Sequence, residues 1–425
     1  MKRPVIHVVG AGVAGLAAAY RLAESGRFDV VVHEARAYPG GRRRSFPDEA
    51  FGGLVDTGNF PLLSGWKATL ALLEAIGAAG EWRRDKEPGV AFADLAKGRR
   101  WRLRPSGGRI PWWLVAAARR GPDLTPADYW PARRLLSARP DATVADFAPK
   151  QGPARALLWR PLTLAALNAE PEEASARLAG GVLRETLRGG GAGLRLLLPS
   201  SGIGRALIEP LTRGAERAGA MLRFERRLVG LTFGGGRVTG LEFEHDRAEI
   251  GPRDGVILAT SWTSAAGLSP GLSAPDLAAP SGASMSLTVH FSIPSPANAP
   301  VVLGVIDGPF HWMFGYRDRI SVAIRDAASR IETPRDALAS ECWRAVAALT
   351  GLSDARPAWR VVPSRRAGFL ATPAEAARRP GQKTQFANLV LAGGHVRPEP
   401  ADTIEAAVRS GERAARVWLE GRAEG

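Results

Sequence analysis

Residues 5–42, VIHVVGAGVAGLAAAYRLAESGRFDVVVHEARAYPGGR, contain the pattern that decides the fold. They predict a buried strand over Val5–Val9, a glycine turn, a helix, and a second strand over Val30–His33 that ends in Glu34. This order of strand, turn, helix, strand and acid is typical of the unit that binds the ADP part of a dinucleotide. We therefore predict an α/β fold with a Rossmann-type domain and a second, discontinuous mixed α+β domain.

The glycines of the turn have separate physical roles. Gly10 permits the tight turn, Gly12 lets the backbone approach a pyrophosphate, and Gly15 lets helix and strand pack closely. The helix N-terminus adds free N–H groups and a partial positive charge. We expect Ala14, in the same turn, to contact the cofactor too. The alternative, an ordinary tight turn, is disfavoured because the strand, the helix and the acid are all present.

The acid selects among dinucleotides. Glu34 lies nineteen residues after Gly15, where its carboxylate can accept hydrogen bonds from ribose hydroxyls. A negative side chain there disfavours a 2′-phosphate, so FAD or NAD is expected rather than NADP. Ala35 follows the acid directly and is expected beside the same group.

Two segments after the acid distinguish FAD from NAD. Gly40-Gly41-Arg42 and Val55-Asp56-Thr57-Gly58 place glycines near a basic residue, where N–H groups and a guanidinium can reach diphosphate oxygens. Here the chain resembles the FAD-dependent amine oxidase and phytoene desaturase superfamily. The resemblance implies FAD, with Arg42 or Arg43 at the diphosphate and Gly41, Thr57 and Gly58 nearby. The alternative for the run of three arginines is a solvated basic loop.

The same resemblance assigns roles to later segments. A strand over 388–393 and a helix that begins at Thr403-Ile404-Glu405 are similar to the elements that close over the flavin, with the helix N-terminus at the isoalloxazine O2. Gly393 and Gly394 form the intervening turn. The superfamily usually has Asp where this chain has Gly394, and His395 is the candidate to replace it. Leu228 is expected at the adenine, and Thr260 near the dinucleotide.

The resemblance extends to a narrower group, the squalene-associated oxidoreductases called hydroxysqualene dehydroxylases. That group usually reads Asp-Asn-Gly-Gln-His where this chain has Asp56-Thr-Gly-Asn-Phe60, so the chain is similar to a divergent member. The motifs that carry this narrower resemblance lie at 161–168, 171–177, 196–199, 308–312, 365–369 and Pro373.

The resemblance implies a reaction in which reduced flavin replaces a carbon-bound hydroxyl with hydrogen. A general acid should protonate the hydroxyl, and His395 is the first candidate. Phe310, Trp312 and Phe314 alternate, so a strand would place them on one face, where they could line the pocket and stabilise a cationic carbon. The alternative for these three aromatic residues is a stripe in the core.

Two other functions stay open from the residues alone. One is another flavin oxidoreductase, such as a carotenoid desaturase or an amine oxidase. The other is a lipid carrier without flavin chemistry, which Gly394 keeps open and the intact glycine turn disfavours. No second glycine fingerprint for a nicotinamide is present, so an external electron donor is expected. The expected substrate is an apolar isoprenoid, and the residues do not define the oligomeric state.

The length of 425 residues favours two domains. We expect an FAD domain of residues 1–80, 195–268 and 384–425, and a substrate domain of 81–194, which looks helical, and 269–383, which looks strand-rich. The single cysteine excludes an internal disulfide, and six scattered histidines give no zinc pattern. Because no apolar run could span a bilayer, we expect a cytoplasmic protein, either free or attached to the cytoplasmic membrane.

The segment 97–139 carries much of the net charge of +15, with eleven Lys or Arg against only Asp123 and Asp128. Five aromatic residues are interleaved with these cations: Trp101, Trp112, Trp113, Tyr129 and Trp130. This composition favours an anionic membrane surface. The alternative is an arginine-rich composition with tryptophans in the core. Nucleic acid is not expected because no nucleic-acid-binding motif accompanies the patch.

Overall fold

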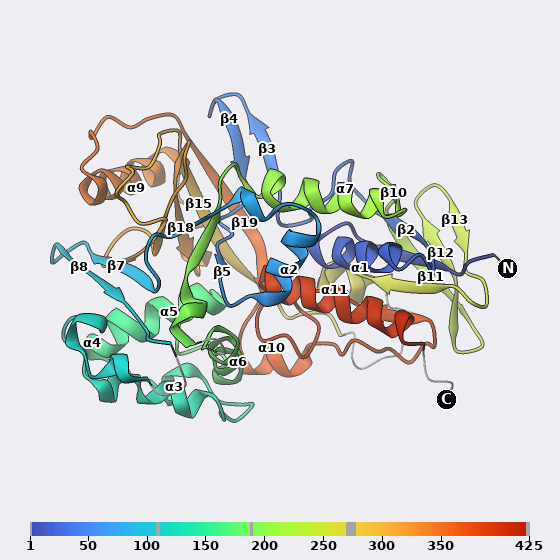
Figure 1. Cartoon of the computed structure of the whole chain (residues 1–425), viewed down its shortest axis with the longest axis horizontal. Coiled ribbons are helices and arrows are strands. Elements are labelled where there is room, and N and C mark those ends of the chain that lie inside the picture. Colours follow the sequence, from blue (N-terminus) through green and yellow to red (C-terminus); the bar gives the residue numbers. More distant parts are fainter. Residues whose placement is uncertain (1, 108–110, 188–189, 269–277, 422–425) are drawn as a thin grey trace.

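The computed structural model describes residues 2–107, 111–187, 190–268 and 278–421. Figure 1 shows two regions, with α1, α7 and α11 around a sheet near both termini, and a second sheet with α9 at the opposite end. The helices are α1 Val13–Glu24, α2 Lys67–Ala75, α3 Trp130–Leu135, α4 Gly152–Ala154, α5 Arg160–Leu167, α6 Ala176–Leu187, α7 Glu209–Arg217, α8 Trp262–Gly267, α9 Arg335–Thr350, α10 Pro373–Arg378 and α11 Ile404–Leu419.

A five-stranded parallel sheet forms the first region, in the order β10-β2-β1-β14-β20. Its strands are β1 Val5–Val9, β2 Asp29–His33, β10 Met221–Arg223, β14 Gly255–Leu258 and β20 Leu389–Leu391. β1 lies at its centre and is buried over most of its length, which agrees with its unbroken apolar sequence. The carboxyl ends of β1, β2 and β14 therefore meet at one edge, where the glycine turn and Glu34 lie.

A seven-stranded mixed sheet forms the second region, in the order β19-β15-β18-β17-β16-β7-β8. α9 packs on one face through Leu338, Cys342 and Trp343, while the helical residues 130–187 pack on the other face. Its strands are β7 Val90–Asp94, β8 Arg99–Leu103, β15 Ala283–Phe291, β16 Val302–Ile306, β17 Trp312–Gly315, β18 Ile320–Arg325 and β19 Trp359–Phe369.

Three small sheets complete the described strands. A three-stranded sheet, β5-β9-β6, lies between the two regions, and a hairpin, β3-β4, leads into Thr57. The third sheet has the order β11-β12-β13. The bounds are β3 Ser45–Asp48, β4 Gly53–Asp56, β5 Leu62–Leu63, β6 Trp82–Arg84, β9 Leu196–Pro199, β11 Leu228–Gly234, β12 Arg237–Phe243 and β13 Arg247–Glu249.

The prediction that the segment 81–194 is helical is wrong for its first part. Residues 82–103 supply β6, β7 and β8, and β8 closes the edge of the seven-stranded sheet. The arginines of Arg99–Leu103 obscure the alternation of polar and apolar residues that would have indicated a strand. Trp101 in this strand stacks on Phe92, with ring centroids 5.6 Å apart. Trp101 therefore packs against the core and is unavailable to a membrane surface.

A buried ion pair joins the two regions. Arg319 Nη2 lies 2.6 Å from Asp56 Oδ2, and both side chains are 1% exposed. Asp56 Oδ1 also accepts hydrogen bonds from Ser45 Oγ and from the backbone N–H of Ile203. The side chain of His290 on β15 meets the carbonyl oxygen of Asp56 at 2.9 Å. These contacts hold the turn at Thr57 against the second sheet.

Helices α1 and α11 approach so closely that their contact requires glycine. A Cβ atom at Gly411 would overlap the carbonyl oxygen of Ala14 and crowd the backbone of Ala18. The neighbouring side chains Ala407, Ala414 and Ala415 are also small and buried. This packing sets the position of the N-terminus of α11.

Within the described ranges, the structure contains no helix with the length and apolar character that crossing a bilayer requires.

Replacing Gly411 with Val should separate the two helices and lower the free energy of unfolding by about 1–3 kcal/mol, the usual cost of overpacking. Urea unfolding followed by circular dichroism measures the change. The control is Gly267→Ala in α8, where a Cβ meets nothing within 4 Å. Equal stability of the Gly411→Val variant and the control would contradict the proposed role of this contact.

Candidate active site

The glycine turn after β1 leaves open space where a pyrophosphate would lie. A Cβ at Gly15 would overlap the carbonyl oxygen of Gly10, and one at Gly10 would lie 2.7 Å from the carbonyl oxygen of Ala259, so packing requires both glycines. By contrast, nothing lies within 4 Å of a Cβ at Gly12, the N-cap of α1. The first N–H groups of α1, including that of Ala14, surround this open space, which suits an anion.

The ribose acid is held beside this turn. Glu34 Oε2 accepts a hydrogen bond from the N–H of Ala11 at 2.8 Å, and Oε1 accepts one from the N–H of Arg36 at 3.0 Å. Arg226 N–H donates to the carbonyl oxygen of Glu34, so the chain that enters β11 at Leu228 lies near Glu34 and Ala35. The backbone nitrogen of Thr260 lies beside Gly10. The residues predicted at the adenosine end therefore lie together.

The second glycine pair lies against the first turn. The N–H of Gly40 donates to the carbonyl oxygen of Ala11 at 2.8 Å, and a Cβ at Gly41 would lie 3.6 Å from Gly12 Cα. Gly40 and Gly41 both have positive φ, which glycine adopts without strain. The following Arg42 and Arg43 are thereby directed along the edge of the sheet toward the second region.

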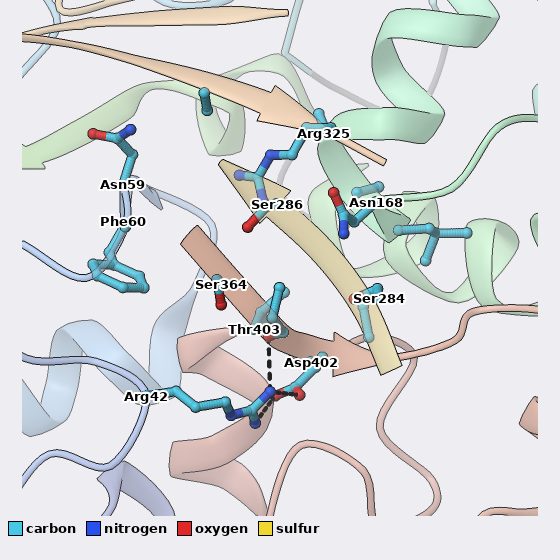
Figure 2. Close-up of a pocket in the computed structure, with 18 of the residues that line it drawn as sticks. Arg42, Asn59, Phe60, Asn168, Ser284, Ser286, Arg325, Ser364, Asp402 and Thr403 are labelled. Carbon is cyan, nitrogen blue, oxygen red and sulfur yellow. Dashed lines mark hydrogen bonds and ion pairs between the residues drawn. The ribbon is translucent and has the colours of Figure 1, made fainter. Parts of the chain in front are cut away.

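A cavity of about 1140 Å³, including its open mouth, lies between the two sheets. Six of its lining residues are predicted flavin contacts: Arg42, Arg43, Thr57, Gly58, Thr403 and Ile404. An apolar wall comes from Phe60, Trp66, Leu167 and Phe369, and a polar strip comes from the strands of the second sheet. Figure 2 shows Arg42 and Asp402 at one end of this cavity and Arg325 at the other.

Thr403 caps α11 as predicted, since its side chain accepts a hydrogen bond from the N–H of Ala406 at 3.0 Å. The cap leaves the helix N-terminus directed at the cavity, where its partial positive charge favours negative charge on a bound group. Asp402, immediately before the cap, forms an ion pair with Arg42 and lies 3.6 Å from Arg43. Burial alone would raise the pKa of the Asp402 carboxyl, but the two arginines outweigh burial and hold that pKa well below its usual range.

Asp402 occupies the space that a side chain at Gly394 would need. A Cβ at Gly394 would overlap Asp402 Oδ1 and lie 3.1 Å from Asp402 Cα. A carboxylate therefore lies beside the Gly393–Gly394 turn even though position 394 has none. Asp402, which forms ion pairs with both arginines, is therefore a second candidate beside His395 to take the place of the usual Asp.

His395 is poorly placed to act as a general acid. Its side chain stacks on Trp262, with ring centroids 6.3 Å apart, and it is absent from the lining of the cavity. Burial lowers its pKa to about 4, an effect that Asp402 offsets only in part. The imidazole is therefore neutral near pH 7 and has no proton to spare as an acid.

The aromatic residues Phe310, Trp312 and Phe314 do not line this cavity. β17 begins at Trp312, so Phe310 precedes the strand and does not follow its alternation. Trp312 and Phe314 pack in the core on the helical side of the sheet, while Phe310 packs in the core under α9. The prediction that these three side chains share one face and line the pocket is therefore wrong. They pack in the core, as the alternative interpretation had it.

The polar strip was not among the features predicted from the sequence. Ser284, Ser286 and Thr288 point from β15 into the cavity, and Ser364 and Arg325 join them from β19 and β18. Asn168, at the end of α5, donates to the carbonyl oxygen of Met285 and accepts from the N–H of Asp326, which ties the helix to both strands. The available signal was the alternation of polar and apolar residues along 284–291.

The fold and this site define an FAD-dependent oxidoreductase, and the chain belongs to the flavin-containing amine oxidoreductases, whose family model matches residues 13–419. Among its relatives, a hydroxysqualene dehydroxylase of Rhodopseudomonas palustris is 40% identical over 97% of this chain and 98% of that protein. A second hydroxysqualene dehydroxylase, from Sinorhizobium fredii, is 38% identical over the same shares. These similarities confirm the resemblance to the squalene-associated group.

A solved structure shares the fold. A putative protoporphyrinogen oxidase from Exiguobacterium superposes with a TM-score of 0.69 at 19% identity, covering 99% of this chain and 100% of that chain. The cofactor is FAD, and the open turn at Gly12, the acid Glu34 and the arginines at the cavity fit its parts. When bound, it supplies hydride chemistry at its isoalloxazine ring.

Replacing Asp402 with Ala should weaken FAD binding about ten- to a hundredfold, the equivalent of about 1.5–3 kcal/mol for a charged hydrogen bond. Gly394→Asp alone should also weaken binding, because the two carboxylates would overlap. The double variant Gly394→Asp/Asp402→Ala should recover affinity, since one carboxylate again faces Arg42. Titration of the apoproteins with FAD measures the affinity of all three variants. If the two losses of affinity simply add in the double variant, a carboxylate at position 394 does not replace the one at position 402.

Proposed function

We propose that the protein catalyses the FAD-dependent reductive dehydroxylation of hydroxysqualene to squalene, as part of squalene and hopanoid synthesis. One observation carries the proposal: the cavity at the predicted flavin contacts has an apolar wall and, on the strands of the second sheet, a polar strip. A long isoprenoid chain matches the wall, and one hydroxyl group matches the strip. The names of the full-length relatives support the same substrate.

The reaction balances with a two-electron donor. A C–O bond of the substrate breaks, a C–H bond forms with a hydride from the reduced cofactor, and the departing oxygen takes up a proton to leave as water. The protein positions the reacting carbon, since Phe60, Trp66 and Phe369 hold the chain on one side. The N-terminus of α11 stabilises the reduced, more negative form of the cofactor. An external donor supplies the electrons.

The two other candidate functions receive less support. Among the described residues, the cavity lining includes no lysine, a residue that amine oxidases often use to position water. A lipid carrier without flavin chemistry would not need open space at Gly12 or the arginines that follow Gly41. Both alternatives predict that reduced protein would leave hydroxysqualene unchanged.

An anaerobic assay tests the proposed function. Protein reduced with dithionite and mixed with hydroxysqualene should yield squalene in an amount equal to the flavin that becomes oxidised. Gas chromatography measures the product, and visible absorbance measures the flavin. Reduced flavin that persists beside unchanged substrate would contradict the proposal.

We also propose that the protein docks on the cytoplasmic face of an anionic membrane through residues near α3. Trp112 and Trp130 are 69% and 59% exposed, and Val115, close to Trp112 in sequence, is 73% exposed. Arg133 and Arg134 are exposed and have no ion pair within the part of the chain that the structure describes. Trp113 packs edge-on against Tyr129, and residues 108–110 lie outside the described ranges.

Replacing both Trp112 and Trp130 with Ser should reduce cosedimentation with phosphatidylglycerol vesicles several-fold, because each indole contributes apolar area at the interface. Phosphatidylcholine vesicles and high salt should weaken binding of the unmodified protein. Val229→Ser is the matched control, since Val229 is 51% exposed on β11, far along the chain. Equal sedimentation of the double variant and the control would remove this proposal.

A further inference from the structure

One cation in the cavity lacks an anionic partner. Arg325, the last residue of β18, lines the cavity, and its side chain forms no hydrogen bond or ion pair among the residues that the structure describes. Its Nε is buried without a hydrogen-bond acceptor. By contrast, Arg319 on the preceding loop meets Asp56 at 2.6 Å, and Arg160 pairs with Glu170.

The surroundings of Arg325 leave room for a ligand. Ser364, Ser286 and Arg325 form one row across β19, β15 and β18, because Ser286 pairs in register with both of the others. Figure 2 shows the side chains of Arg325 and Ser286 on these adjacent strands. Only small side chains flank the guanidinium along the strip, and Asn168 is already committed to backbone groups. Among the described residues, no carboxylate pairs with Arg325, and the oxygens nearest to it along the strip are the hydroxyls of Ser286 and Ser364.

Arg325 is half-buried, and a half-buried cation without a counter-ion costs free energy unless a bound group compensates it. Burial lowers the pKa of the Arg325 guanidinium, and no carboxylate offsets that effect. Such an uncompensated group in a cavity is an expected feature of a binding or catalytic site. An oxygen atom that carries or develops negative charge is the complementary ligand.

We propose that Arg325, assisted by Ser286, binds the hydroxyl oxygen of the substrate and stabilises the negative charge that develops on it as the C–O bond breaks. This inference rests on the proposed function and adds a catalytic residue to it. The electron pair of the C–O bond passes to the oxygen, the reduced cofactor would supply the hydride that the carbon receives, and a proton from the buffered solvent converts the departing hydroxide to water. Arg325 stays protonated throughout and acts by its charge and N–H groups.

This role also fits the location of the aromatic residues. Phe310, Trp312 and Phe314 lie in the cores, so any aromatic contact with a carbocation would have to come from Phe60, Trp66 and Phe369 of the apolar wall. The positive charge of the Arg325 guanidinium disfavours a free carbocation in this cavity. Hydride arrival and departure of the oxygen are therefore expected to occur together, with Arg325 acting on the oxygen.

Replacing Arg325 with Gln should slow single-turnover oxidation of reduced enzyme by hydroxysqualene about 10²–10³-fold, the usual effect of removing one oxyanion donor. The FAD content should not change. Arg325→Lys should retain part of the rate, and added guanidinium at non-denaturing concentration should partly rescue Arg325→Ala, which a purely structural role would not allow. Arg366→Gln, an exposed arginine on β19, is the charge-matched control and should keep the unmodified rate.

A binding measurement separates this inference from the proposed function. Octanoate, a carboxylate with a short apolar tail, should perturb the visible absorbance of the oxidised enzyme, and Arg325→Gln should bind it at least about tenfold more weakly, as loss of a charged hydrogen bond predicts. If unmodified enzyme fails to convert hydroxysqualene but shows this difference, the proposed function fails and the oxygen-binding role of Arg325 stands. If Arg325→Gln keeps both the single-turnover rate and the octanoate affinity of the unmodified enzyme, the inference is overturned.

Discussion

The contact between α1 and α11 is the constraint on which the rest of the site depends. Gly411 lets α11 lie against the backbone of Ala14, within the first turn of α1. The two helix N-termini consequently serve one ligand, since that of α1 faces the diphosphate position and that of α11 faces the cavity. Asp402 reaches Arg42, and Thr403 caps α11 at the cavity, only because α11 begins at this place. A shift of either helix would separate the parts of the cofactor site.

The second sheet contributes the chemistry that the cofactor domain lacks. Asp56 and Arg319 are buried charges with a structural role. They form an ion pair at 2.6 Å, and Asp56 accepts further hydrogen bonds. Breaking such a pair typically costs about 3–5 kcal/mol, so it holds the two regions firmly together. Arg325, at the other end of β18, has no such partner among the described residues. This difference supports the proposal that Arg325, and not Arg319, pairs with an oxygen atom of the substrate.

The cofactor half of the site could be predicted from sequence because its signals are local. Gly10, Gly12, Gly15 and Glu34 lie within one strand–helix–strand unit. Backbone packing requires glycine at positions 10 and 15, while Gly12 leaves space for a ligand and Glu34 directly follows the second strand. The Thr403 cap is equally local. Arg325 could not be found in this way, because its environment depends on the register of three strands distant in sequence. The assignment of His395 as the acid needed correction for a similar reason, since its burial by Trp262 is a tertiary contact.

The proposed chemistry is reductive, and the origin of the new hydrogen tests it most directly. Hydrogen on the reduced flavin exchanges with solvent, so a single turnover in deuterated water transfers deuterium if the flavin is the hydride donor. The account predicts squalene that carries a single deuterium at the former carbinol carbon, with one flavin oxidised for each molecule formed. Squalene without deuterium at that carbon, or a product formed without oxidation of the flavin, would contradict it.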